Sequence, residues 1–494
     1  MEKLLKLKNI LEEVRMINIS IGQLSWDQST EQPKLARGEY SNVLAYLYGK
    51  SHSLIINDEV RDIINSLKDD DSLNNIDRAI LNELKDDFEK KEKIPKEQYE
   101  EYARLQSLST LAWEEAKEKD DFEIFKPFLE KIVDYDKKFI ELIGINGHPY
   151  NTLLRDYEKG LNVDDLDKFF HTLKEELMPL VLKASSVGNP VFDFEHKAYD
   201  IDKQRKFSRF LSEYLGLDFQ KAVLKESAHP FTDAFSNKDT RITSHYHLNK
   251  FLSSIFSTAH ETGHALYEQG IDDEIAHTIL GSGSSMAMHE SQSRLYENII
   301  VRNKNFWVPI YDKLQAIYYD NLKDVSLDDF YRCINKSQPS LIRIEADELT
   351  YPFHIIIRYE IEKLLFEDKV KVSDLPEIWN EKVYEYLGIK PTGFSDGILQ
   401  DIHYSKGNFG YFPSYALGSA YASQFAYGMS KTLNLDECLL QGNLLKINEY
   451  LRRNMHKYGK LKTSKELLLE ISGEEFNPKY YTEYLKDKFS SIYK

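Results

Sequence analysis

Two histidines and a glutamate stand at a spacing that suits metal chemistry, in the segment His260-Glu261-Thr262-Gly263-His264. On a helix, residues four apart project from nearly the same face, so both imidazoles can reach one Zn²⁺ ion. Glu261, which lies between them, is placed to accept a proton from a water on that metal. The pattern predicts metal-dependent hydrolysis of peptides.

The surroundings of this segment favour a helix. Residues 250–269 carry a helical pattern, with Asn249 as a candidate N-cap and Gly270 as a natural C-terminal stop. Leu252 and Phe256 lie on the stripe that the two histidines continue, which predicts that both imidazoles face inward. The alternative is a pair of buried core histidines. That alternative is unfavourable because two inward imidazoles beside a carboxylate are hard to satisfy without a cation.

A catalytic zinc site needs a third protein ligand and one open position. Glu290 is the candidate, because it follows His264 by 26 residues and a glycine-rich turn at 281–284 lets a second helix return. Two alternatives stay open from the residues alone. Glu290 could form a surface ion pair with Arg294, and its neighbour His289 could be the ligand instead.

Helical periodicity predicts the elements that position these residues. Strand patterns are few and occur at 191–200 and 239–246, which suggests a short hairpin beside the metal-site helix. We expect one nearly all-helical domain over residues 1–494, in which two helical lobes frame any cleft. The predicted helices cover residues 2–22, 39–57, 75–90, 96–118, 122–144, 164–185, 202–215, 250–269, 284–302, 308–322, 343–366, 415–433 and 440–457.

Composition and charge exclude several classes of protein. The formal charge of −17 argues against a nucleic-acid partner. Because no apolar run approaches about 18 residues, no membrane-spanning helix is expected, and the N-terminus resembles an amphipathic helix more than a signal peptide. Cys333 and Cys438 form neither a disulfide framework nor a zinc-finger pattern, so a reduced, cytoplasmic compartment is expected.

Further short motifs follow one another along the chain. They are the HETGH segment, His229-Pro230-Phe231, Asp239-Thr240-Arg241-Ile242-Thr243, His289-Glu290-Ser291-Gln292, Ile342-Arg343 with Ala346-Asp347, and Gly397-Ile398-Leu399-Gln400-Asp401-Ile402-His403. In this order they resemble the motifs of the carboxypeptidase Taq family of metallocarboxypeptidases, and the resemblance covers nearly the whole length. The early stretch Ser25–Thr30 is similar as well. One departure is Tyr404, since the family has tryptophan after the histidine of its last motif.

The resemblance implies a metal site and an activity. The family's zinc ligands fall on His260, His264 and Glu290, with Glu261 as the general base. Family members are almost wholly helical, with a deep groove that holds the metal, N-terminal helices (here about 1–60) that act as a lid, and usually a homodimeric assembly. They release single residues from peptide C-termini with broad specificity. Zinc is the expected metal, and cobalt is a common substitute.

Stabilising the oxyanion of the reaction needs a preorganised donor, and the segment 407–415 offers two phenols. The resemblance favours Tyr411 over Tyr415, with His403 assisting. In a chain with 32 tyrosines, either phenol can also be an ordinary core residue.

A carboxypeptidase must also recognise a free α-carboxylate, which suits the planar fork of arginine. Arg343, within the family's Ile-Arg motif, is the first candidate and Arg241 the second. The structural alternative for Arg343 is an ion pair with Asp347, four residues on.

Several other polar residues suit either a role in the site or a role in stabilising the fold. The candidates to line the groove or to orient ligands are His229, Asp239, Gln400 and Asp401. Glu268 continues the histidine stripe by one turn and is a candidate to orient a ligand histidine.

Two other functions compete with this prediction. A zinc oligopeptidase or dipeptidyl carboxypeptidase has the same metal centre and differs in the distance from the metal to the carboxylate-binding arginine. A silent, metal-stabilised peptide-binding protein is the non-enzymatic alternative. The intact Glu261 argues against it, and so does the absence of a cysteine near the motifs to close the site.

Overall fold

Helices make up most of the molecule, which the computed structural model describes over residues 2–145 and 147–494. The prediction of a nearly all-helical chain with a small sheet is confirmed. Asparagines start several helices, as where the Asn57 side chain accepts a hydrogen bond from the Val60 N–H. The first helices are α1 (Glu2–Thr30), α2 (Arg37–Ile55), α3 (Asp58–Leu67), α4 (Asn75–Lys91), α5 (Lys96–Lys119), α6 (Phe122–Ile143), α7 (Tyr150–Leu154), α8 (Val163–Val187) and α9 (Ile201–Leu215).

The remaining helices begin with the one that carries the HETGH segment. A π-helix, η3 (Leu295–Val301), directly continues α11. The α-helices are α10 (Phe251–Gly270), α11 (Met286–Arg294), α12 (Lys304–Trp307), α13 (Tyr311–Ile317), α14 (Tyr319–Leu322), α15 (Leu327–Ile334), α16 (Tyr351–Phe366), α17 (Leu375–Leu387), α18 (Pro413–Ser430), α19 (Leu435–Leu440), α20 (Leu444–Asn454), α21 (Ser464–Ser472) and α22 (Lys479–Ile492).

A sheet of three strands precedes the metal-site helix in the described part of the chain. Its strands are β1 (Ala222–Glu226), β2 (Thr232–Ser236) and β3 (Asp239–Ser244), in the spatial order β1-β3-β2. Strand β3 pairs in parallel with β1 and antiparallel with β2. The predicted strand at 239–246 therefore exists as β3, but the predicted hairpin with residues 191–200 is wrong, because β3 pairs with β1 and β2.

The predicted strand at 191–200 is wrong. That segment contains only a short 3₁₀ turn, Asp193–His196. The alternation of its apolar residues nevertheless reports burial correctly, because Phe192 and Phe194 are buried and their neighbours are not. A period-two pattern identifies the buried face of a segment without supplying a neighbouring strand to pair with it.

Apolar side chains gather in two large cores and two smaller ones. The first core includes Leu173 of α8, Trp379 of α17 and Leu417 of α18. The second core includes Ile255 of α10, Trp307 and Phe330, and it contains both cysteines, Cys333 and Cys438, as free thiols. A third, N-terminal core joins α1, α3 and α4. Each core is contiguous, as expected when amphipathic helices bury their apolar faces against one another.

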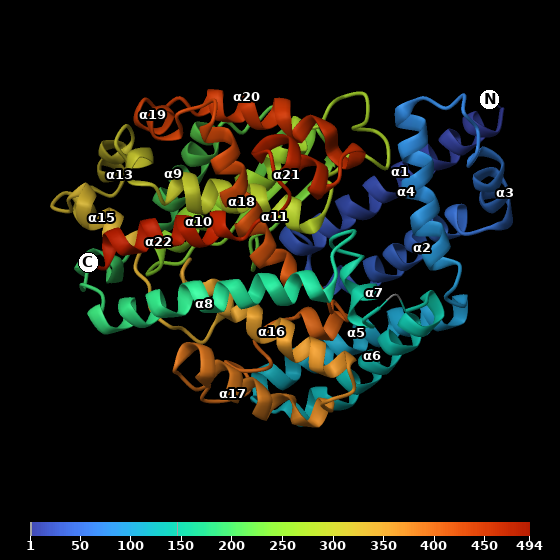
Figure 1. Cartoon of the computed structure of the whole chain (residues 1–494), viewed down its shortest axis with the longest axis horizontal. Helices are drawn as coiled ribbons and strands as arrows, with labels where there is room; N and C mark the ends of the chain where they lie inside the picture. Colours follow the sequence, from blue (N-terminus) through green and yellow to red (C-terminus); the bar gives the residue numbers. More distant parts are fainter. Residues whose placement is uncertain (1, 146) are drawn as a thin grey trace.

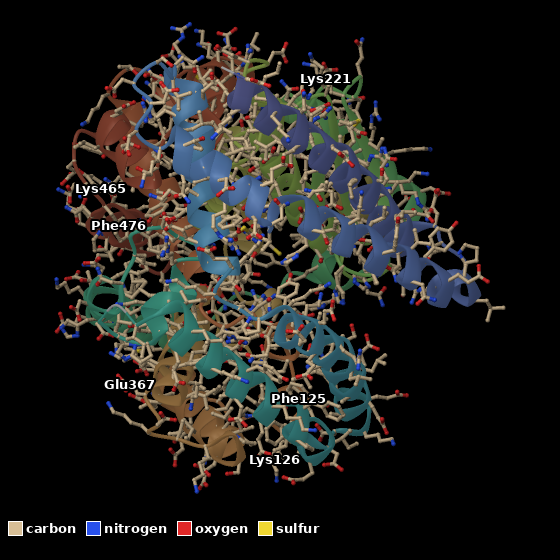
Figure 2. All side chains as sticks on the ribbon, turned by 90° about the vertical axis from the view of Figure 1, so that its right-hand side faces the viewer. Phe125, Lys126, Lys221, Glu367, Lys465 and Phe476 are labelled. Atoms are coloured by element: carbon tan, nitrogen blue, oxygen red, sulfur yellow. The ribbon has the colours of Figure 1, made fainter. Side chains whose placement is uncertain are left out.

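The helices around these cores occupy distinct regions of the molecule. In Figure 1, α8 crosses the middle, α16 and α17 lie with α5 and α6 below it, and α10, α18 and α20 lie above it. Helices α1 to α4 form the right-hand end (Figure 1). Figure 2, which looks onto that end, places Phe125 and Lys126 of α6 low and Lys221 and Lys465 high. Among the described helices, none combines the length and the apolar character that crossing a membrane requires.

Candidate active site

The two histidines of the HETGH segment lie side by side near the middle of α10. Their ring centroids are 4.9 Å apart, as the four-residue spacing predicts. The predicted boundaries of this helix need correction, because Lys250 rather than Asn249 is the N-cap and provides no side-chain cap. Gly270 is the last helical residue rather than a stop outside the helix. On either side of the histidines, Ala259 and Leu266 pack into the second core, which fixes the face that α10 presents.

Two glycines let neighbouring helices approach the histidines closely. A Cβ atom on Gly263 would lie 2.6 Å from the carbonyl oxygen of Gln292 on α11. A Cβ atom on Gly418 of α18 would lie 2.6 Å from Cβ of Glu290. Both distances are shorter than van der Waals contact, so any larger residue would push α11 away. Glycine at these two positions therefore brings Glu290 within reach of α10.

His260, His264 and Glu290 converge on one point. Oε2 of Glu290 lies 3.6 Å from Nε2 of His260 and 3.5 Å from Nε2 of His264. Donor atoms from these three residues all lie within 4.8 Å of one another, and the described residues contain no other such group. Tetrahedral zinc with ligand distances of about 2.0–2.1 Å separates neighbouring donors by about 3.3 Å, so the residues present fit a metal ion of this kind.

Glu290 pairs with Arg294 and also faces the two histidines. Its Oε1 accepts a hydrogen bond from Nε of Arg294 at 2.7 Å, while Oε2 faces the histidines. The ion pair with Arg294 is buried rather than on the surface. Burial acts to raise the pKa of Glu290, but Arg294 and the two histidines hold that pKa well below its usual range. Glu290 is therefore ionised at pH 7.

The outer nitrogen of His260 is held by a residue that the sequence analysis missed. Nδ1 of His260 lies 2.9 Å from Oε2 of Glu297 in η3, and Glu297 also pairs with Arg294 and Arg302. A signal was present in the sequence, because Glu297 lies seven residues after Glu290 and thus on the same helical face. Glu297 orients the ring and leaves Nε2 facing Glu290.

His289 is not the third donor of the group that contains His260 and His264. Its Nδ1 lies 2.6 Å from Nδ1 of His264, and its Nε2 lies 2.8 Å from Oε1 of Glu268. Both ring nitrogens of His289 therefore already have partners, which are His264 and Glu268. Glu268, which the sequence placed one turn beyond the histidines, contacts His289 rather than either of the histidines that face Glu290.

Glu261 lies beside the sheet. Its Oε2 accepts a hydrogen bond of 2.6 Å from the Thr232 hydroxyl, and its backbone carbonyl accepts another at 3.1 Å. Burial raises the pKa of Glu261, against the opposing effects of His260 and Thr232. Thr232 is a second residue that the sequence analysis missed, and the sequence gives no sign of its contact with Glu261 because β2 meets α10 only in the fold.

An aromatic cluster contains both candidate phenols. Nε2 of His403 lies 3.1 Å from the hydroxyl of Tyr415, and the His403 ring stacks on Tyr411 with centroids 5.4 Å apart. Tyr411 also packs edge-on against Tyr157, at 4.9 Å. Burial and then the charge of Arg343 lower the pKa of His403 to about 3, so its ring is neutral at pH 7. Burial and nearby Glu290 raise the pKa of Tyr411 to about 12, which keeps its phenol protonated.

Arg343 is buried and belongs to a three-residue charge cluster. Its Nε and Nη2 donate to Oδ1 of Asp401 at 3.1 and 2.8 Å, and Nε of Arg358 donates to the other carboxylate oxygen at 2.8 Å. The alternative pairing of Arg343 with Asp347 is wrong, because Asp347 instead accepts hydrogen bonds from residues such as Thr350. Arg358 is a third residue that the sequence analysis missed.

The amide of Gln400 supports the same cluster. Its Oε1 accepts from the backbone N–H of Arg343 at 2.9 Å and from Nη2 of Arg358 at 2.8 Å, while Nε2 donates to backbone carbonyls such as that of Leu341. Gln400 and Asp401 thus hold Arg343 through hydrogen bonds to its backbone N–H and to its guanidinium.

Arg241 and Asp239 form a pair of their own on β3. Nε and Nη2 of Arg241 donate to the two carboxylate oxygens of Asp239 at 2.9 Å each. The guanidinium lies over Phe235, 4.7 Å from its centroid, and near Trp26 of α1. Ile242 pairs across the sheet with Thr232, the residue that contacts Glu261. Because side chains alternate along a strand, Arg241 points to the opposite face of the sheet from Ile242.

His229 lies in the loop between β1 and β2, outside the group that Glu290 forms with the two histidines. Burial and then Lys117 of α5 lower the pKa of His229. Lys117 in turn donates to the backbone carbonyl of Gln400 at 2.8 Å. Lys117 therefore lies near both His229 and the backbone of Gln400.

A cavity of about 1500 Å³ lies between the N-terminal helices and α5. It is lined by α1, α2 and α4, by Ala103, Arg104 and Ser107 of α5, and by Arg155, Asp156 and Lys159. Asp156 directly precedes Tyr157, which packs on Tyr411. The N-terminal helices, predicted as a lid, form one wall of this cavity.

Comparison with known proteins identifies the family. The family model described as carboxypeptidase Taq (M32) metallopeptidase matches residues 6–489. The chain belongs to this family. It is accordingly a metallocarboxypeptidase, as the sequence motifs predict, and a metal cofactor follows from the family.

Individual relatives agree over their full lengths. This carboxypeptidase is 42% identical to carboxypeptidase 1 of Bacillus subtilis over 488 residues, covering 98% of this chain and 97% of the relative. It is 36% identical to thermostable carboxypeptidase 1 of Pyrococcus furiosus, with 98% of both chains covered. Among solved structures, the M32 carboxypeptidase of Deinococcus radiodurans matches with a TM-score of 0.97 at 29% identity, over 100% of both chains.

Proposed function

We propose that this carboxypeptidase releases single amino acids from peptide C-termini with broad specificity, and that it holds one Zn²⁺ ion between His260, His264 and Glu290. The convergence of two Nε2 atoms and Oε2 of Glu290 supports this ligand set most strongly. The side chains of the two histidines are 19% and 16% exposed, so the site is reachable from solvent. Three protein donors with an accessible open side are typical of catalytic rather than structural zinc sites.

The metal, when bound, supplies a Lewis acid that activates water and polarises the scissile carbonyl. Cobalt can take the same place, because the ligand types do not discriminate strongly between the two ions. All other steps are assigned to side chains of the chain itself.

Glu261 is the proposed general base. It lies between the two histidines in sequence and its carboxylate is buried, which raises its pKa and makes it a better proton acceptor than an exposed glutamate. The Thr232 hydroxyl, which donates to Oε2 at 2.6 Å, fixes the orientation of the carboxylate. Glu261 accepts the proton of the attacking water and delivers it to the leaving amine.

Tyr411 is the proposed donor to the oxyanion. Its phenol is protonated and lies close enough to Glu290 for that charge to raise the Tyr411 pKa. Tyr415 is a weaker candidate because its hydroxyl is bonded to His403 at 3.1 Å. His403 supports the cluster as a neutral ring that stacks on Tyr411 and bonds to Tyr415. A preorganised donor of this kind acts without reorganisation during the reaction.

Arg343 is the proposed partner of the substrate's α-carboxylate. The reason is that the buried cluster around it carries an excess of positive charge. Two guanidinium groups, of Arg343 and Arg358, share the single carboxylate of Asp401. Nearby Glu362 does not offset the excess at pH 7, because burial raises its pKa to about 8. A substrate carboxylate would neutralise the cluster, and charge-assisted bonds to arginine are strong in such surroundings. Gln400 and Asp401 act by positioning Arg343, and Arg241, Asp239 and His229 line the outer approach.

The decisive test is mass spectrometry of the products from a mixed-sequence peptide, with zinc or cobalt present and a chelator control. A ladder of single-residue losses from the C-terminus, abolished by the chelator, is the expected result. Dipeptide release or internal fragments would assign the chain to the dipeptidyl carboxypeptidase or oligopeptidase class instead. No cleavage by fully metallated protein would support the silent peptide-binding protein.

The family resemblance also supports a homodimer, and the two unpaired cysteines support a cytoplasmic location. Sedimentation velocity at micromolar concentration is the measurement for the first of these. A single species with the mass of one 57.8 kDa chain would contradict the dimer.

A further inference from the structure

The two histidines of the proposed metal site are supported in different ways. The outer nitrogen of His260 faces a carboxylate directly, at 2.9 Å from Glu297. The outer nitrogen of His264 faces another imidazole, at 2.6 Å from Nδ1 of His289. A hydrogen bond between two imidazole nitrogens requires a proton on one of them and a lone pair on the other. The distribution of protons over this pair therefore decides whether Nε2 of His264 has a lone pair.

Glu268 determines that distribution. Its Oε1 lies 2.8 Å from Nε2 of His289 and also accepts from the backbone N–H of Gly283 at 3.1 Å. The carboxylate oxygen, which also accepts from Gly283, is the acceptor for Nε2–H of His289. With its proton on Nε2, the His289 ring accepts at Nδ1 from Nδ1–H of His264. Nε2 of His264 is left unprotonated, and it faces Glu290 at 3.5 Å.

Packing holds the intermediate ring in place. A Cβ atom on Gly283 would lie 2.7 Å from Cδ2 of His289, so the turn before α11 lies directly on the imidazole. The ring of Tyr267, one turn along α10 from His264, lies on another side with its centroid 5.3 Å away. Glu268 itself is buried, with 5% of its surface exposed. The ring of His289 is thus confined between Glu268 and His264.

We propose that Glu268 and His289 form a relay that positions His264 and fixes its tautomer for metal binding. The inference rests on the proposed assignment of His264 as a metal ligand. His289 is a positioning residue, since it contacts His264 rather than the site where a metal or substrate would lie. Residues that orient a ligand histidine in this way typically contribute about 10–100-fold to metal affinity.

The test compares His289→Phe with His289→Gln in the full chain. Phenylalanine keeps a flat ring and removes both nitrogens, whereas the glutamine carbonyl can still accept from Nδ1–H of His264. Zinc affinity is measured by competition with a chromophoric chelator, and the visible absorption of the Co²⁺-loaded protein reports ligand geometry. We expect about 10–100-fold weaker zinc binding and an altered cobalt spectrum for His289→Phe, with most of the affinity restored in His289→Gln.

Controls separate this relay from a purely structural role. His171→Phe changes an exposed histidine on α8 and should leave affinity and spectrum unchanged. A structural role for His289 would lower the thermal stability of the metal-free protein and leave the zinc affinity of folded protein as in the parent. Should His289→Phe not fold, Glu268→Ala removes the acceptor from the other end of the relay and is judged by the same two readouts.

The outcomes also distinguish this inference from the proposed function. If His264→Ala binds zinc as tightly as the parent, the ligand set itself is wrong. If His264→Ala loses zinc while folded His289→Phe, or Glu268→Ala in its place, stays within about twofold of the parent affinity, the relay is wrong and the ligand set stands.

Discussion

Glu261 is the residue whose replacement separates metal binding from catalysis most cleanly. Glu261→Gln keeps the shape of the side chain and removes its basicity, and Glu261 is outside the group of donors that converge. We expect kcat to fall by about 10²–10⁴-fold while the metal content stays at the parent level. Elemental analysis and turnover of one peptide, measured on the same sample, provide the check.

Glu115→Gln on the exposed face of α5 serves as the matched control for that variant, since it makes the same chemical change on a side chain that is 53% exposed to solvent. Its turnover should equal that of the parent. Substantial residual turnover in Glu261→Gln would remove Glu261 from its role as the base.

Arg343 provides a second test at the level of single residues. Arg343→Lys keeps the buried positive charge beside Asp401 and removes the planar fork that can hold a carboxylate through two bonds. We expect KM for peptides with a free C-terminus to rise about tenfold or more, because a lysine makes weaker charge-assisted bonds to carboxylates. Steady-state kinetics on a peptide and on its C-terminal amide would measure this effect. Equal cleavage of both by the parent enzyme would show that carboxylate recognition is absent.

Individual residues differ in how far the sequence predicts their surroundings. Glu290 could be predicted to lie beside His264, because a short turn returns the chain to the preceding helix. The structure places the two side chains together. The contact between Thr232 and Glu261 depends on how β2 docks on α10, which no local pattern encodes. Arg358 was missed for a related reason. It lies inside a helix, directly after three isoleucines, and the carboxylate that makes its burial tolerable comes from residue 401.

At the level of elements, the approach of α11 to α10 depends on Gly263. Gly263→Ala would place a Cβ atom 2.6 Å from a backbone carbonyl, which cannot move aside as a flexible side chain can. We expect α11 and Glu290 to shift away from the histidines, so that zinc affinity falls about tenfold or more and stability falls by about 1–3 kcal/mol, as for other overpacked sites. Chelator competition and thermal unfolding would measure the two effects.

Gly49→Ala is the matched control for this substitution. Gly49 lies inside α2, where an added methyl group would meet no atom within 4 Å, and its φ angle is not positive. Alanine there should stabilise the helix by about 0.5–1 kcal/mol and leave zinc affinity unchanged. A Gly263→Ala variant that binds zinc like the parent would mean that the close contact of the two helices is not needed.

The elements also show where sequence patterns stop being informative. The long helices α5, α6 and α8 lie within two residues of their predicted limits. For α6 and α8, amphipathic periodicity and the side-chain caps Asp121 and Asn162 define the helix locally. Helices α3, α15, α17, α21 and α22 were not predicted, although α3 and α15 are strongly amphipathic, because they are short or lie in stretches crowded with charge. Strand β1 was missed too. Its burial is irregular along its length, so it lacks the alternation by which a strand is detected.

For the molecule as a whole, Glu362 on α16 links stability to pH. Its Oε2 accepts hydrogen bonds from the Tyr150 hydroxyl at 2.6 Å and the Gly410 N–H at 2.8 Å. Burial raises its pKa from 4.5 to about 8, so between these values the folded chain binds a proton that the unfolded chain has released. This contribution to stability is complete below a pH of about 4.5 and is lost as the pH rises through about 8, with a slope of at most about 1.4 kcal/mol per pH unit.

Glu362→Gln removes this linkage while keeping an acceptor for Tyr150 and Gly410. We expect the variant to gain stability relative to the parent as the pH is raised from 5 to 9, seen as a growing difference in Tm. Chemical denaturation at pH 5, 7 and 9 gives the corresponding free energies of unfolding. A difference between variant and parent that does not change with pH would contradict the assignment of a raised pKa to Glu362.

The placement of the two cysteines has a practical consequence for experiments. Both thiols are buried in the second core, which also contains much of α10, and the chain has no others. Burial raises the pKa of both, so a thiol-specific reagent can react only after that core opens locally. The labelling rate of the unmodified protein therefore reports the opening of one core alone. Zinc bound by residues of both α10 and α11 should restrain the two helices against local opening. The labelling rate should therefore fall when zinc is bound.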